Sequence, residues 1–176
     1  MRWHLSDEQL AYQQALRSWL GSVAPSETLR GWLDSGANGH RAFGRRFVED
    51  GFAGVGFAEE VGGQGGGLVE LALTAEELAY AGVPSSQWLA AAIAAPLLTR
   101  RPDLIEASIN GTLTALLVPA EVIPSFACVA SADGGRVPRV LAGDLASSFL
   151  VVDGEALRLV PGSAASGAER KLPDPS

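Results

Sequence analysis

Hydrophobic residues follow a helical period through about the first 110 residues of the chain. The clearest stripe lies near the N-terminus, where apolar residues recur every three or four positions, as on one face of an α-helix. Ser6 and Gln9 form a capping-box pattern before it, and Gly21 is expected to end the helix. The residues of the stripe are Tyr12, Ala15, Leu16, Trp19 and Leu20.

Five more helices are predicted in this region. The strongest pattern is 69–81 (VELALTAEELAYA), which Gly82 is expected to end. Another helix carries Phe43 and Phe47 on one face and is expected to stop at Gly51. The remaining three are predicted at 27–33 with Ser26 as cap, from Ser85 or Ser86 to Leu98, and at 103–110.

The period changes near Gly111, where short aliphatic and β-branched runs begin. Pro, Gly, Asp and Ser separate these runs, and Asp153-Gly154 is a hairpin-turn signal. The pattern predicts an α+β fold: an N-terminal all-α helical domain over 1–110, then an incomplete antiparallel β domain over 111–176. The expected strands are 112–118, 126–130, 137–141, 149–152 and 157–160.

Charge and composition narrow the possible partners. The 176 residues carry 13 basic and 20 acidic side chains, a formal net charge of −7. A protein that binds nucleic acid or an anionic membrane surface needs a basic face, so neither is an expected partner of this acidic chain. The longest apolar run, 88–98, is about half the length of a membrane-spanning helix. Without a signal-peptide pattern either, the chain is expected to be soluble and cytoplasmic.

The glycine-rich stretch 51–67 (GFAGVGFAEEVGGQGGG) raises the alternative of a dinucleotide-binding loop. The G-x-G-x-x-G template fails there, because it places Glu59 or Leu68 at the last glycine position. No strand-like run precedes the stretch, and the only lysine of the chain is Lys171. We therefore predict a structural loop between helices.

The remaining chemistry-bearing side chains favour structural roles. His4 and His40 have no acidic partner at ligand spacing, which predicts surface or capping roles and no metal site. The adjacent pairs Glu59-Glu60 and Glu76-Glu77 are expected on solvated helix faces, because neighbours in a helix point about 100° apart. Cys128, the single cysteine, is expected to pack in a strand.

The segment 48–81 resembles the N-terminal helical domain of acyl-CoA dehydrogenases. In that family a helix ends at a glycine, here Gly51, and a P-E-E-x-G-G-x-G-G stretch follows, here 58–66 (AEEVGGQGG). A helix with an E-E-L-A motif comes next, here 76–79. The opening LSDEQLAYQQALRSWL is also similar to the family's first helix. The resemblance covers about the first 110 residues well and the β segment loosely.

The resemblance implies a flavoprotein with a helical domain, a middle β domain and a C-terminal four-helix domain. Such enzymes remove a proton α to an acyl-CoA thioester and pass a hydride from the β carbon to FAD. The family's catalytic glutamate belongs to the C-terminal domain, which the 176 residues do not include. No residue here is therefore nominated as catalytic, and the chain alone is expected to be inactive. Strand faces that include Phe149 are expected to lie uncovered.

The resemblance also implies the flavin contacts, through an alignment in which each motif can shift by one or two residues. The family's T-E-P falls on 120–122, G-S-D near 125–127 and W-I-T near 139–141. The threonine hydroxyl is missing, although backbone amides there can still bind, so FAD is expected to be weak or absent in the isolated chain. The candidate cofactor-binding residues are Leu117, Ala120, Glu121, Ser125, Val140 and Leu141.

Three functions remain open. The first is an FAD-dependent acyl-CoA dehydrogenase of lipid or steroid catabolism, present here as an N-terminal portion. The second is a non-catalytic partner subunit of a heteromeric member, since the eroded flavin motifs resemble those of such subunits. The third is a helical interaction module without a ligand. The expected partners are an acyl-CoA thioester and further acyl-CoA dehydrogenase subunits, in a homo- or hetero-oligomer.

Overall fold

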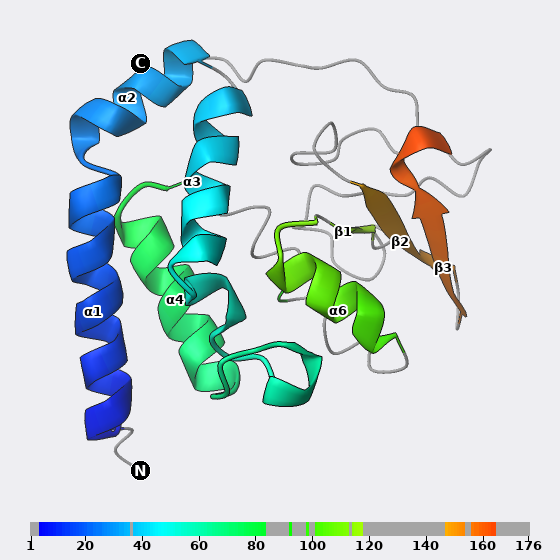
Figure 1. Ribbon diagram of the computed structural model, residues 1–176, viewed down its shortest axis with the longest axis horizontal. Helices are drawn as coiled ribbons and strands as arrows, with labels where there is room; N and C mark the ends of the chain where they lie inside the picture. The colour runs from blue at the N-terminus through cyan, green and yellow to red at the C-terminus, as the bar shows by residue number, and fades with distance from the viewer. Residues whose placement is uncertain are drawn as a thin grey trace.

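Helices and strands occupy separate parts of the molecule in the computed structural model (Figure 1). The structure describes residues 4–35, 37–83, 92, 98, 101–112, 114–117, 147–153 and 156–164. Helices α1 to α4 pack together on one side, a three-stranded sheet lies on the other, and α6 lies between them. This arrangement confirms the predicted α+β class.

Helix α1 (Asp7–Val23) begins as predicted and ends later than predicted. The Ser6 hydroxyl accepts from the Gln9 N–H at 3.2 Å, and the Gln9 side chain accepts from the Ser6 N–H at 3.0 Å. Gly21 does not end the helix. The end comes at Ala24, with φ −130° and ψ 50°, because Pro25 disfavours the helical conformation in the residue before it.

The other described helices lie close to their predicted positions. In α4 the Gly82 stop is confirmed: Gly82 has φ +71°, and the Val83 N–H donates to the Leu78 carbonyl in a Schellman motif. The helix predicted to reach Leu98 falls almost wholly outside the described residues. The bounds are α2 (Ser26–Ser35), α3 (Ala37–Glu49), α4 (Leu68–Tyr80) and α6 (Pro102–Ile109), with short 3₁₀ turns η1 (Phe52–Gly54), η2 (Glu59–Val61) and η5 (Gly162–Ala164).

The sheet has the order β1 (Thr114–Leu117), β2 (Ser148–Asp153), β3 (Ala156–Pro161). Strands β2 and β3 are antiparallel and Asp153 pairs with Ala156, which confirms the hairpin. Strand β1 runs parallel to β2, so the sheet is mixed rather than antiparallel throughout. A parallel pair needs a long connection, and residues 118–147 separate the two strands in the sequence. The strands predicted at 126–130 and 137–141 lie outside the described residues.

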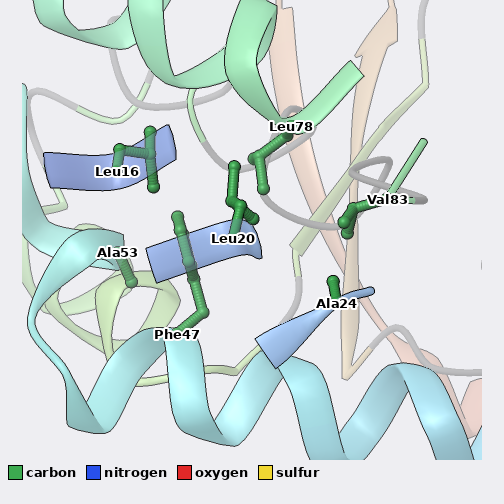
Figure 2. Close-up of a cluster of buried hydrophobic side chains, with 7 residues drawn as sticks. All are labelled: Leu16, Leu20, Ala24, Phe47, Ala53, Leu78 and Val83. Carbon is green, nitrogen blue, oxygen red and sulfur yellow. The ribbon is translucent and has the colours of Figure 1, made fainter. Parts of the chain in front are cut away.

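The helical core forms where α1 meets α3 and α4. Figure 2 shows Leu16 and Leu20 of α1 gathered with Phe47 of α3 and Leu78 of α4. Trp19 lies beside them, with its ring centroid 4.9 Å from that of Phe52 and 5.9 Å from that of Phe47. The predicted stripe of α1 is therefore correct for its large residues. Its small member, Ala15, is exposed.

A second cluster connects the helices to the sheet. Phe57, Ile105 and Ile109 pack there with Leu150 of β2. Phe149 is 7% exposed and Leu150 is 3% exposed. Successive strand residues point to opposite faces, so β2 is covered on both faces at this point. The expectation that the face with Phe149 lies uncovered is wrong, because the Phe149 side chain is buried in the folded chain.

The glycine-rich stretch folds back on itself between α3 and α4. The Gly56 N–H donates to the Gly65 carbonyl at 2.8 Å, the Gly65 N–H to Phe57 at 2.9 Å, and the Gln64 N–H to Gly54 at 2.8 Å. These donors are already satisfied by the chain, which supports the structural interpretation of the loop. Gly65 has φ +78°, and a Cβ at Gly63 would lie 2.7 Å from the Ala58 carbonyl oxygen.

Alanine at either position should therefore destabilise the protein. We expect Gly63→Ala and Gly65→Ala each to lower the free energy of unfolding by about 1 kcal/mol or more, through a steric clash and a left-handed backbone respectively. A Cβ added at Gly31 in α2 would meet no atom within 4 Å beyond its chain neighbours and its own helix backbone. Gly31→Ala is therefore the matched control and should be neutral or stabilising. Urea unfolding followed by circular dichroism measures all three, and wild-type stability in the loop variants would contradict the analysis.

Candidate functional site

One of the six candidate flavin residues lies in the described part of the chain. Leu117 is the last residue of β1 and pairs with Val151 of β2. The other five, Ala120, Glu121, Ser125, Val140 and Leu141, lie outside the described residues. Of the six candidates, the described residues thus include Leu117 alone. They do not amount to a flavin pocket, and no redox step is derived from them.

The described part of the chain shows neither a metal site nor a membrane span. No group of three or more His, Cys, Asp or Glu side chains there could hold a metal ion. No helix there is long and apolar enough to cross a membrane. His4 is exposed, as predicted, and the His40 side chain lies outside the described set.

The most concentrated polar chemistry lies between α1 and α4. Glu77 is 1% exposed, so the prediction of a solvated Glu76-Glu77 pair is wrong for Glu77, although Glu76 is exposed. Glu77 can be buried because α1 surrounds it with donors. The Arg17 guanidinium donates to both carboxylate oxygens, at 2.8 and 2.6 Å, and the Gln13 amide donates at 2.9 Å. Glu59 and Glu60 are exposed, as predicted.

Arg17 closes this site from the solvent side. Its side chain is 58% exposed, and its guanidinium carbon lies 5.6 Å from the ring centroid of Tyr80, within cation–π range. The hydrogen bond to Glu77 raises the pKa of Arg17. The two-pronged contact with a carboxylate is the geometry for which arginine is suited.

Sequence reasoning missed this site, although a signal was available. Glu70, Thr74 and Glu77 recur at the spacing of one helix face, and all three contact α1. A polar helix face of this kind can pack against a polar face of another helix or lie in water. Period alone does not distinguish the two.

Two further carboxylates are held in their charged forms. The hydrogen bond from Gln9 lowers the pKa of Glu70, whose other oxygen accepts from the Gly67 N–H at 2.7 Å. Asp50 accepts from the Trp19 indole N–H at 2.6 Å and from Arg46 at 2.9 Å, and these bonds lower its pKa. Both carboxylates connect segments far apart in the sequence: α1 to α4, and α1 to the end of α3.

Comparison with known proteins identifies the family of this chain. A family model described as "Acyl-CoA dehydrogenase, N-terminal domain" matches residues 6–101, more than half of the chain. The chain belongs to the acyl-CoA dehydrogenase family. The matched range contains α1 to α4, with the Arg17–Glu77 site and the glycine-rich loop. A comparison with curated protein sequences finds no match.

Solved structures show the same fold at low identity. The ChsE4–ChsE5 complex from Mycobacterium tuberculosis matches with TM-score 0.62 and 19% identity, over 93% of this chain and 49% of that one. A variant of the Tcur3481–Tcur3483 steroid ACAD matches with TM-score 0.68 and 23% identity, over 88% and 48%. A second structure of that steroid ACAD gives 0.65 and 18%, over 93% and 50%. This family member thus spans about half the length of these structures.

The low pKa of Glu70 predicts a pH-dependent contribution to stability. The pKa of Glu70 in the folded protein lies below the ordinary pKa of a glutamate, so its contribution to stability is present above that ordinary pKa and is lost as the pH falls through the folded pKa. We expect Glu70→Gln to lower the Tm most near neutral pH, with a difference from wild type that shrinks on acidification. Glu60→Gln, at an exposed position of η2, is the matched control. Thermal unfolding over a pH series tests this, and a difference for Glu70→Gln that grows in acid would contradict it.

Proposed function

We propose that this chain is the N-terminal portion of an FAD-dependent acyl-CoA dehydrogenase that acts on an acyl-CoA thioester in lipid or steroid catabolism. The observation that carries the proposal is the extent of the fold match. It covers 88–93% of the chain, whereas the family model stops at residue 101. In this proposal 1–110 is the helical domain and 111–176 is part of the middle β domain.

The proposal divides the work between this chain and the rest of the protein. FAD, when bound, would accept the hydride from the substrate. This chain would supply one side of the flavin site from the end of β1 onward, through Leu117, Ala120, Glu121, Ser125, Val140 and Leu141. Its helices would form a rigid support for the site. The base that abstracts the proton would come from a segment outside these residues.

A partner subunit within a heteromer is the second candidate. Ala120 stands where the family's flavin-binding threonine is expected, and this substitution removes a hydrogen-bond donor from the proposed flavin site. Three of the matching structures are named as pairs, one as ChsE4–ChsE5 and two as Tcur3481–Tcur3483. In this version the chain would complete a neighbouring subunit's site and hold little flavin itself.

Both versions predict that the 176 residues alone are inactive. We expect no dye reduction above a heat-treated control with a panel of acyl-CoA thioesters, because loss of a positioned base alone removes roughly 10²- to 10⁴-fold of rate. Turnover by the isolated chain would overturn the division of work proposed here. Correct folding of the sample is checked by circular dichroism before the assay.

Flavin retention should depend on assembly. We expect the isolated chain to be colourless after purification and to retain FAD when co-purified with an acyl-CoA dehydrogenase subunit that supplies the C-terminal helices. Light scattering combined with a visible flavin spectrum measures both properties. A yellow isolated chain would show that this portion binds FAD without help. A colourless chain whose mass no such subunit changes would favour the helical interaction module.

A further inference from the structure

The hydrogen bonds between the side chains of α1 and α4 all run in one direction. Gln9, Gln13 and Arg17 of α1 donate to the carboxylates of α4. The Thr74 hydroxyl donates its single proton to the Glu70 carbonyl at 2.7 Å, so the Tyr12 hydroxyl, 2.6 Å away, must be the donor to Thr74. In these contacts α1 offers only donors and α4 only acceptors.

The same contacts define one parallel register. The two residues of each contact are separated by a nearly constant 60 to 64 residues along the chain. Helices α1 and α4 therefore run in the same direction. A slip of α1 by one turn would move it by about 5.4 Å.

The two leucines in the middle of the apolar face do not distinguish this register from a slipped one. Leu16 and Leu20 lie between Tyr12 and Ala24 at four-residue spacing, so a one-turn slip brings another apolar residue to each leucine position. Trp19 does change, because Ala15 or Val23 would take its place. The connection to α2 does not forbid the slip either. Unwinding the last turn of α1 lengthens the chain by about 7 Å, more than the shift requires.

The polar face does distinguish the two. After a one-turn slip, Gly21 or Gln13 would occupy the place of Arg17, and neither carries a guanidinium to meet both oxygens of Glu77. Leu16 or Glu8 would face Thr74 in place of Tyr12. A buried carboxylate without its donors is strongly disfavoured, so Glu77 disfavours the slipped arrangement in addition to the loss of Trp19 from its place in the core.

We propose that Glu77, through Arg17 and Gln13, sets the register in which α1 packs on α4. The pair then acts mainly on conformational uniqueness and contributes little to net stability, because burying a carboxylate offsets much of what the ion pair returns. This role does not rest on the proposed enzymatic activity.

The test uses the full chain and the Trp19 indole as a reporter. The Trp19 Nε1–H donates to Asp50 from the α1 side, so a slip of α1 changes its environment. We expect Arg17→Met/Glu77→Met to unfold within a few degrees of the wild-type Tm while the Trp19 indole signal in a ¹H–¹⁵N spectrum splits or broadens. The signal is assigned with Trp19→Phe in each background.

Two variants serve as controls. Glu77→Gln keeps an acceptor oxygen for Gln13 and Arg17, and it should give one sharp Trp19 signal. Arg101→Gln/Asp103→Asn removes an exposed ion pair elsewhere and should leave the Trp19 signal unchanged.

One sharp Trp19 signal at the wild-type position in the double methionine variant would overturn the proposal. If that variant does not fold, Arg17→Leu/Glu77→Leu decides, because it also removes both members of the buried pair and leaves no carboxylate without donors. Several Trp19 signals would then support the proposal, and a single wild-type signal would overturn it.

Discussion

A carboxylate removed from water must find donors within the protein, and this requirement organises the contact between the first and the fourth helix. Glu77 is fully enclosed, and the three hydrogen bonds that it accepts from side chains come from Gln13 and Arg17. Leu16 and Leu20 lie beside them in the same helix and fill the core. Because α1 carries both the donors and the apolar stripe, its placement also fixes Trp19, and with it the aromatic contacts of α3 and η1.

Much of the helical architecture could be predicted from the sequence, because local signals decide it. The capping box at Ser6 and the Gly82 stop depend on nearby residues alone, and both are present. The end of α1 depends on a competition between two local signals. Gly21 tolerates a helix interior, whereas Pro25 acts on the residue before it, so the proline determines where the helix ends.

Features that depend on distant partners could not be predicted in this way. Glu76 and Glu77 are adjacent in the sequence and differ in burial only because α1 lies over one of them. The parallel pairing of β1 with β2 and the burial of Phe149 likewise depend on contacts between segments that are distant in the sequence. The proposed flavin residues follow from family resemblance, and all six stay a prediction. This chain therefore reveals its membership of the acyl-CoA dehydrogenases in its scaffold more clearly than in its chemistry.

The distance along the chain between Arg17 and Glu77 has a consequence for biosynthesis. Sixty residues separate them, so a ribosome adding 5–20 residues per second needs roughly three to twelve seconds between the two. Throughout that interval the apolar stripe of α1 has no α4 to cover it. Helix α1 can thus pack against α4 only after α4 has emerged, and until then it exposes Leu16 and Leu20 to whatever the nascent chain meets.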